Sequence, residues 1–139
     1  MEPAQSAAPQ ITLTQVSVEP EEGKGNWKIL WRIANLNSQP LEIRAVRLPH
    51  GQFESAERRF EPALMLAPKQ AAQFEVVVRC DEPAGLVTEN AFLIFQVFRR
   101  GERWRIFARV RVTVNKNEIP AAETELITTQ QVGFSGVPD

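Results

Sequence analysis

The 139-residue chain has one histidine, His50, one cysteine, Cys80, and no tyrosine. A lone cysteine excludes a disulfide within the chain and is typical of a reducing compartment. His50 lies in the loop Pro49-His50-Gly51 and has no obvious partner for acid–base catalysis. Cys80 continues the apolar face of its segment, so we interpret it as a small buried hydrophobic residue and not as a nucleophile. We therefore expect no enzymatic activity.

Other chemical signatures are also missing. No cluster of cysteine, histidine and carboxylate residues indicates a metal site, and no glycine-rich loop indicates phosphate binding, so we expect no cofactor. No apolar run approaches the roughly 18–20 residues that cross a bilayer. Residues 1–6 lack the basic patch and apolar stretch of a secretory signal. These absences lead us to expect a cytoplasmic protein without a membrane span.

What the chain does have is a strong alternation of apolar and polar residues. Its composition, 43% hydrophobic and 24% charged, is that of an ordinary globular protein, and its length suits one domain. Apolar residues occupy every second position in Trp27–Ile33, Ala72–Cys80 and Trp104–Val114, which is the period of half-buried strands. Weaker strand patterns cover Ile11–Val18, Leu41–Leu48 and Leu64–Leu66, and Val87–Phe98 is apolar on both faces.

Turn-forming residues separate these segments, and Arg99–Glu102 has the composition of a hairpin tip. Ser55–Phe60 is the one segment that we expect to form a helical turn. Seven short strands over about 100 residues favour a single all-β, antiparallel β-sandwich spanning residues 11–115. Residues 1–10 and the acidic C-terminal segment 116–139 are expected to be flexible.

A family resemblance supports this fold. It rests on the runs Trp31-Arg32-Ile33-Ala34-Asn35, Pro40-Leu41, Val46-Arg47-Leu48, Phe60 through Leu66-Ala67-Pro68, and Phe74-Glu75-Val76-Val77-Val78. Over roughly residues 11–114, they resemble bacterial immunoglobulin- and fibronectin-III-like modules of the CARDB type. Those modules usually have glycine where this chain has Lys69, and the tyrosine corner of many immunoglobulin-like domains is absent. The resemblance implies an Ig-like sandwich of about seven strands used for binding or spacing, and it assigns no functional residue.

Charge is distributed unevenly although the formal net charge is only −1. Residues 24–114 carry 15 Lys/Arg and 9 Asp/Glu, whereas residues 1–23 and 115–139 are acidic. Such asymmetry says nothing about fold, but it is informative about partners. The arginines of the centre therefore become the first candidates for a binding surface.

Many of these arginines fall on one predicted hairpin. Pairing Val87–Phe98 with Arg103–Val114 puts a purely apolar set on one face, which supports this register. In it, Phe98 lies opposite Arg103 and Asn90 lies opposite Arg111. The other face, called the Arg/Phe face below, carries Phe92, Ile94, Phe98, Arg103, Arg105, Phe107, Arg109 and Arg111. We expect Arg99 and Arg100 at its rim and Arg44 or Arg47 beside it.

Like charges at alternate positions of a strand repel, so a merely solvated face more often interleaves the two signs. Aromatic residues beside arginine are enriched at protein interfaces. We therefore predict a non-catalytic interaction module, a small accessory, assembly or scaffold factor, that binds a protein partner through the Arg/Phe face. The alternatives are a nucleic-acid-binding face with stacking aromatics, a solvated face covered by arginine stems, and a homodimer contact.

The C-terminal segment gives a further hypothesis. Residues 123–134 combine acids with β-forming residues. This segment can add a strand to an open sheet edge. It can also place Leu126, Ile127 and Phe134 over the Arg/Phe face, where its acids would meet the arginines. The segment then either covers this face in its own molecule or docks on a partner, and the sequence is compatible with both.

Overall fold

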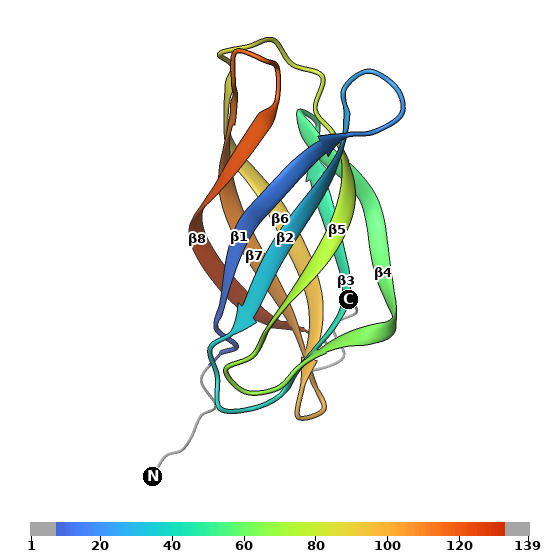
Figure 1. Ribbon diagram of the computed structural model, residues 1–139. Helices are drawn as coiled ribbons and strands as arrows, with labels where there is room; N and C mark the ends of the chain where they lie inside the picture. Colours follow the sequence, from blue (N-terminus) through green and yellow to red (C-terminus); the bar gives the residue numbers. More distant parts are fainter. Residues whose placement is uncertain (1–7, 133–139) are drawn as a thin grey trace.

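The structure, a computed structural model, describes residues 8–132 and consists of eight β-strands (Figure 1). They are β1 (Ile11–Pro20), β2 (Asn26–Asn35), β3 (Leu41–His50), β4 (Phe53–Leu66), β5 (Ala71–Arg79), β6 (Val87–Arg99), β7 (Glu102–Val114) and β8 (Pro120–Val132). The expected all-β antiparallel class is confirmed, with one strand more than we counted from the sequence. Residues 8–132 contain no helix, and hence none that is long and apolar enough to cross a membrane.

All eight strands belong to one sheet in the order β1-β2-β5-β4-β3-β6-β7-β8. The joint between β4 and β5 is weak, because β4 pairs with β3 along much of its length but with β5 only at Glu54 and Arg79. The sheet folds over at this joint into two layers, β1-β2-β5 and β4-β3-β6-β7-β8. In Figure 1 the first layer lies in front of β6 and β7, with β4 and β8 at the two sides.

Side chains close the opposite edge of the molecule, where β1 meets β8. The amide of Gln15 donates to the Pro120 carbonyl at 3.3 Å and accepts from the N–H of Ala122 at 2.9 Å. The Thr124 hydroxyl donates to the Leu13 carbonyl at 2.9 Å. Residues 8–132 have no backbone ladder between β1 and β8. The described chain therefore forms a flattened, nearly closed cylinder, and side-chain hydrogen bonds between β1 and β8 join its two edges.

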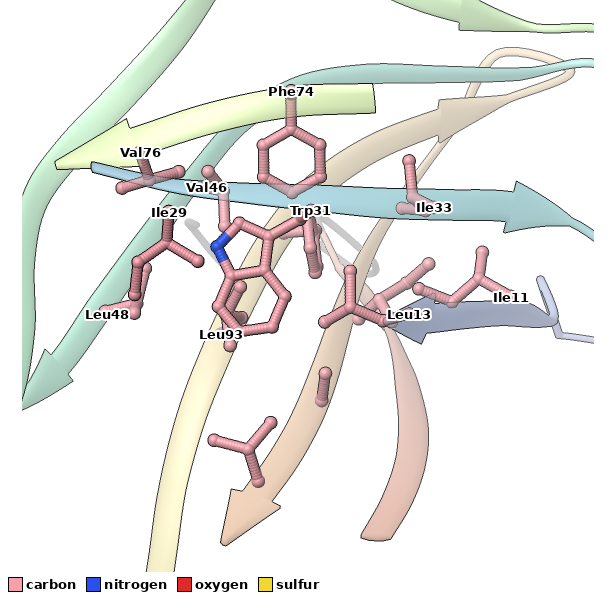
Figure 2. Packing of buried hydrophobic residues seen from close by; sticks show 14 of the residues in the cluster. Ile11, Leu13, Ile29, Trp31, Ile33, Val46, Leu48, Phe74, Val76 and Leu93 are labelled. Atoms are coloured by element: carbon pink, nitrogen blue, oxygen red, sulfur yellow. The ribbon is translucent and has the colours of Figure 1, made fainter. Parts of the chain in front are cut away.

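The inward faces of the strands form one hydrophobic core with Trp31 near its middle (Figure 2). The β2 residues Ile29, Trp31 and Ile33 are fully buried, as the alternation predicts. The Trp31 ring meets Phe53 edge-on at 6.5 Å between centroids. Its Nε1 is buried without a hydrogen-bond partner among the described residues. Trp31 therefore contributes to stability by packing and not by a polar contact.

The helical turn expected over Ser55–Phe60 is wrong, because these residues lie inside β4. Phe60 is buried, and its ring meets Phe74 edge-on at 5.6 Å between centroids. Pairing with β3 shifts register twice, so the polar–apolar alternation is interrupted and the segment does not look like a strand. Tertiary packing of Phe60 against the neighbouring layer thus overrides the local helix signal.

The boundary expected at residue 115 is also wrong. Asn115–Ile119 forms a tight turn in which the Asn115 carboxamide oxygen accepts from the N–H groups of Asn117 and Ile119. Residues 120–132 then form β8, which pairs with β7 along its whole length. The described part of the segment thus adds a strand to a sheet edge, as one form of our hypothesis proposed. Phe134 and the expected flexibility of residues 1–7 and 133–139 lie outside the described residues.

Replacing Trp31 tests the role of this residue in the core. Trp31→Ala should lower the free energy of unfolding by about 3–5 kcal/mol, because it removes a large, fully buried ring. Trp31→Phe should lower the free energy of unfolding by less, because no hydrogen bond of Nε1 is lost. Urea unfolding followed by circular dichroism measures both, and Val77→Ala, at a position 50% exposed, is the control. Equal stability of Trp31→Ala and Val77→Ala would contradict this packing.

Candidate functional site

The β6–β7 hairpin turns tightly at Arg100-Gly101. Both residues have positive φ angles, 54° and 77°, as a two-residue type I′ turn requires. Beyond the closing pair of Arg99 with Glu102, the register is the expected one: Phe98 pairs with Arg103, Gln96 with Arg105, Ile94 with Phe107 and Phe92 with Arg109. The turn therefore fixes which side chains share the Arg/Phe face.

The expected pairing of Asn90 with Arg111 is wrong. A bulge between Thr88 and Ala91 shifts the register, and Asn90 adopts a φ of 61°. Asparagine is among the residues that tolerate this left-handed conformation best. The bulge lets Glu89 approach Arg111, whose Nε lies 3.1 Å from Glu89 Oε2. One arginine of the face is thus paired with an acid that the simple register did not place there.

The structure brings all eight predicted residues to the outward side of β6 and β7. The inward side carries the fully buried Leu93, Phe95, Ile106 and Ala108, among others. On the outward side, Phe92 and Phe107 meet edge-on at 6.4 Å between centroids and are half-buried. Ile94 between the arginines is only 8% exposed. The Arg/Phe face is therefore an apolar floor surrounded by guanidinium groups.

Strand β3 extends this face, as we expected for Arg44 or Arg47. Arg47 lies opposite Ile94 in the β3–β6 pairing. The Arg44 guanidinium carbon lies 3.8 Å from the centroid of the Phe98 ring, in a cation–π contact. Arg44 also forms an ion pair with Glu42. The face consequently spans three strands, β3, β6 and β7.

The arginines of the face differ in their contacts with acids. Arg111 pairs with Glu89, and Arg109 Nε lies 4.0 Å from Glu125 Oε1 on β8, so an acid of the C-terminal segment does meet an arginine. By contrast, neither Arg47 nor Arg105 has an acidic partner within residues 8–132. Sequence reasoning treated the arginines as equivalent, and the structure separates them.

Arg47 and Arg105 border a shallow hollow in the Arg/Phe face. Its volume is about 230 Å³. Its lining, called the basic hollow below, includes Arg47, Ile94, Gln96, Phe98, Arg103 and Arg105. Val132, near the end of β8, borders it as well. Strands β3, β6, β7 and β8 all contribute to this one site.

Arg99 does not lie at the exposed rim where we expected it. It is only 4% exposed, its guanidinium carbon lies 5.2 Å from the Trp104 ring centroid, and Nη2 lies 3.7 Å from Glu102 Oε1. Burial lowers the pKa of Arg99 from its usual value, and Glu102 opposes that shift. Arg99 has the same parity as the inward-facing residues of β6, which explains its burial. It closes the end of the core instead of joining the Arg/Phe face.

The two residues considered for catalysis occupy structural positions. His50 Nδ1 accepts a hydrogen bond from the Gln52 N–H at 3.1 Å within the β3–β4 turn. Cys80 is 3% exposed and belongs to the hydrophobic core, which confirms its expected burial. Its backbone carbonyl accepts from Trp27 Nε1 at 3.0 Å. Within the described residues, no group of three or more His, Cys, Asp or Glu side chains is arranged to hold a metal ion.

No protein-family model matches the sequence, and no curated protein matches it either. The resemblance to CARDB-type modules therefore stays a prediction. The contacts of the Arg/Phe face and of its basic hollow are the basis for a functional proposal.

Titration of Cys80 should be visible in the stability of the protein. Burial, with smaller contributions from Glu82 and Asp81, raises the pKa of the Cys80 thiol from 9.0 to about 11. Because the folded-state pKa is above the unfolded value, the buried neutral thiol stabilises the fold below about pH 9, and this stability is lost between pH 9 and 11.

The free energy of unfolding should therefore fall more steeply over this pH window in the natural protein than in a Cys80→Ala variant. Urea titrations at intervals between pH 8 and 11 measure the difference. The alanine variant corrects for every other group that titrates in the same range. Parallel curves for the two proteins would contradict the raised pKa.

Proposed function

We propose that this protein is a non-catalytic, cytoplasmic interaction module that binds a protein partner through the Arg/Phe face. The observation that carries the proposal is the continuous outward surface of β3, β6 and β7, where half-buried aromatic rings alternate with arginines. Aromatic and arginine side chains are the residue types that most often dominate binding energy at protein interfaces. A small accessory or scaffold factor fits such a surface.

The strand order supports an immunoglobulin-like character for the module. In immunoglobulin domains, strands A-B-E-D form one sheet and C-F-G the other. The order β1-β2-β5-β4 followed by β3-β6-β7 is the same when the strands are lettered along the chain. Here β4 pairs mainly with β3, and β8 extends the second sheet.

Acids within the same surface favour a protein partner over nucleic acid. Glu42, Glu89 and Glu125 each neutralise one arginine of the face. A phosphate backbone is best matched by an uninterrupted positive track, because its affinity comes from releasing counterions along the strand. A surface of mixed charge with an apolar floor is better matched by the equally mixed surface of a protein.

Charge reversal on the face tests the proposal. The triple variant Arg105→Glu, Arg109→Glu and Arg111→Glu should retain at least tenfold less of any protein that the natural module captures from lysate. A control with the same charge change, Lys28→Glu, Arg32→Glu and Arg79→Glu, alters the outward side of β2 and β5 and should retain the partner. Both variants are first checked for unchanged thermal unfolding.

Nuclease treatment separates the alternatives. Capture that survives nuclease and is lost only in the Arg/Phe-face variant supports a protein interface. Capture that disappears with nuclease, and that weakens steeply with salt, would instead assign the face to nucleic acid. Equal capture by the two triple variants would mean that the arginines of β7 are only solvated surface.

A further inference from the structure

Two arginines that line the basic hollow, Arg47 and Arg105, have no acidic partner among the described residues. Arg44, Arg109 and Arg111 are each paired with a glutamate, whereas Arg47 and Arg105 are not. These two residues come from β3 and β7, on either side of β6, and both line the basic hollow. Two cations held on opposite sides of one depression repel each other, so an anion placed between them is stabilised by both.

The size of the hollow limits what can enter it. Its volume of about 230 Å³ is below the range of about 300–1,000 Å³ that is usual for clefts enclosing small-molecule ligands. One side chain of a larger molecule fits such a depression better than a whole metabolite. The floor formed by Ile94 and Phe98 is apolar, so the entering group should combine a charged end with an aliphatic stem.

We infer that the basic hollow binds the carboxylate of an aspartate or glutamate side chain in an extended segment of the partner protein. This inference rests on the proposed function. Guanidinium groups bind carboxylates through paired, charge-assisted hydrogen bonds, which suits both Arg47 and Arg105. The aliphatic stem of the acid then lies over Ile94 and Phe98.

The layout of the face predicts the residue that follows the acid. The row of Gln96 and Arg105 is followed, along the strands, by the row of Ile94 and Phe107, which is apolar on β6 and β7 and has Arg47 at its β3 end. Residues i and i+2 of an extended chain point to the same side, about 6.6 Å apart, which matches the distance between alternate residues on one strand. The partner segment should therefore carry an apolar residue two positions from its acid.

The probe is a seven-residue capped peptide in which Glu and Asp alternate with Thr, and Leu stands two positions from one acid. A control peptide has Gln and Asn in place of the acids. Binding to the full-length protein is measured by fluorescence anisotropy of labelled peptides at low salt. The natural protein should bind the acidic peptide at least tenfold more tightly than the control peptide.

Matched variants assign the binding to the basic hollow. Arg47→Gln with Arg105→Gln should lower the affinity for the acidic peptide at least tenfold, because two charge-assisted contacts are lost. Arg32→Gln with Arg79→Gln removes the same charge from the outward side of β2 and β5, away from the Arg/Phe face, and should weaken binding of the acidic peptide less than threefold. Circular dichroism and thermal unfolding verify that both variants fold.

Three results would overturn the inference. The first is no measurable binding of the acidic peptide to the natural protein at 1 mM, and the second is equal weakening by the two variants. The third is evidence for another occupant of the hollow. Such evidence is a single-stranded oligonucleotide that binds through Arg47 and Arg105 more tightly than the acidic peptide does, or self-association of the protein that the Arg47→Gln/Arg105→Gln variant abolishes. A different case is that the acidic peptide fails to bind while the triple Arg105→Glu, Arg109→Glu and Arg111→Glu variant still loses its captured partner. In that case the proposed protein interface on the Arg/Phe face is retained, and only the inference about the basic hollow is rejected.

Discussion

The pairing register of β6 with β7 is the constraint on which both the core and the Arg/Phe face depend. Successive side chains of a strand point to opposite faces, so a slip of one residue would exchange the two sets. It would bury Arg105 and Arg109 and expose Ile106 and Ala108, which are now fully buried. The type I′ turn at Arg100-Gly101 holds the register at one end. The core therefore determines the outward face: once the apolar set is buried, the arginines have no other side to occupy.

Much of this arrangement was readable from the sequence because it is local. The two strands of the hairpin are adjacent in the chain, β7 has an unbroken apolar alternation, and pairing β6 with it leaves a purely apolar set on one face. The strands that the sequence pattern does not predict, β4 and β8, lack that regularity. In β8, Pro120 is buried and Ala122 and Ile127 pack against the core, and the remaining positions are mostly threonine, glutamine or glutamate. In β4, Phe53 and Phe60 are both buried although they are seven positions apart, an odd spacing that a regular strand would place on opposite faces. The two register shifts of the β3–β4 pairing interrupt the regular period.

The sorting of the arginines could not be predicted, because their counterions come from elsewhere. Glu125 reaches Arg109 only because β8 is a strand, and Glu89 reaches Arg111 only because a bulge shifts the register at Asn90. Neither event is visible in a pattern of charges along one strand. Arg99 is different, because its burial follows from the inward parity that it shares with Phe95 and Val97.

The ion pairs divide the face into two parts with different roles. The ion pair of Arg109 with Glu125 joins β7 to β8 within the fold. Because Glu125 neutralises much of its charge, Arg109 attracts an anionic partner less strongly. Arg47 and Arg105 link no strands in this way, and their mutual repulsion across Ile94 is a small cost to the folded state. A site whose charges oppose folding but converge on an apolar hollow is organised for an anion that arrives from outside. Since the pairings of β6 with β3 and with β7 fix the backbone positions of both arginines before any partner binds, little further ordering of this backbone is needed on association.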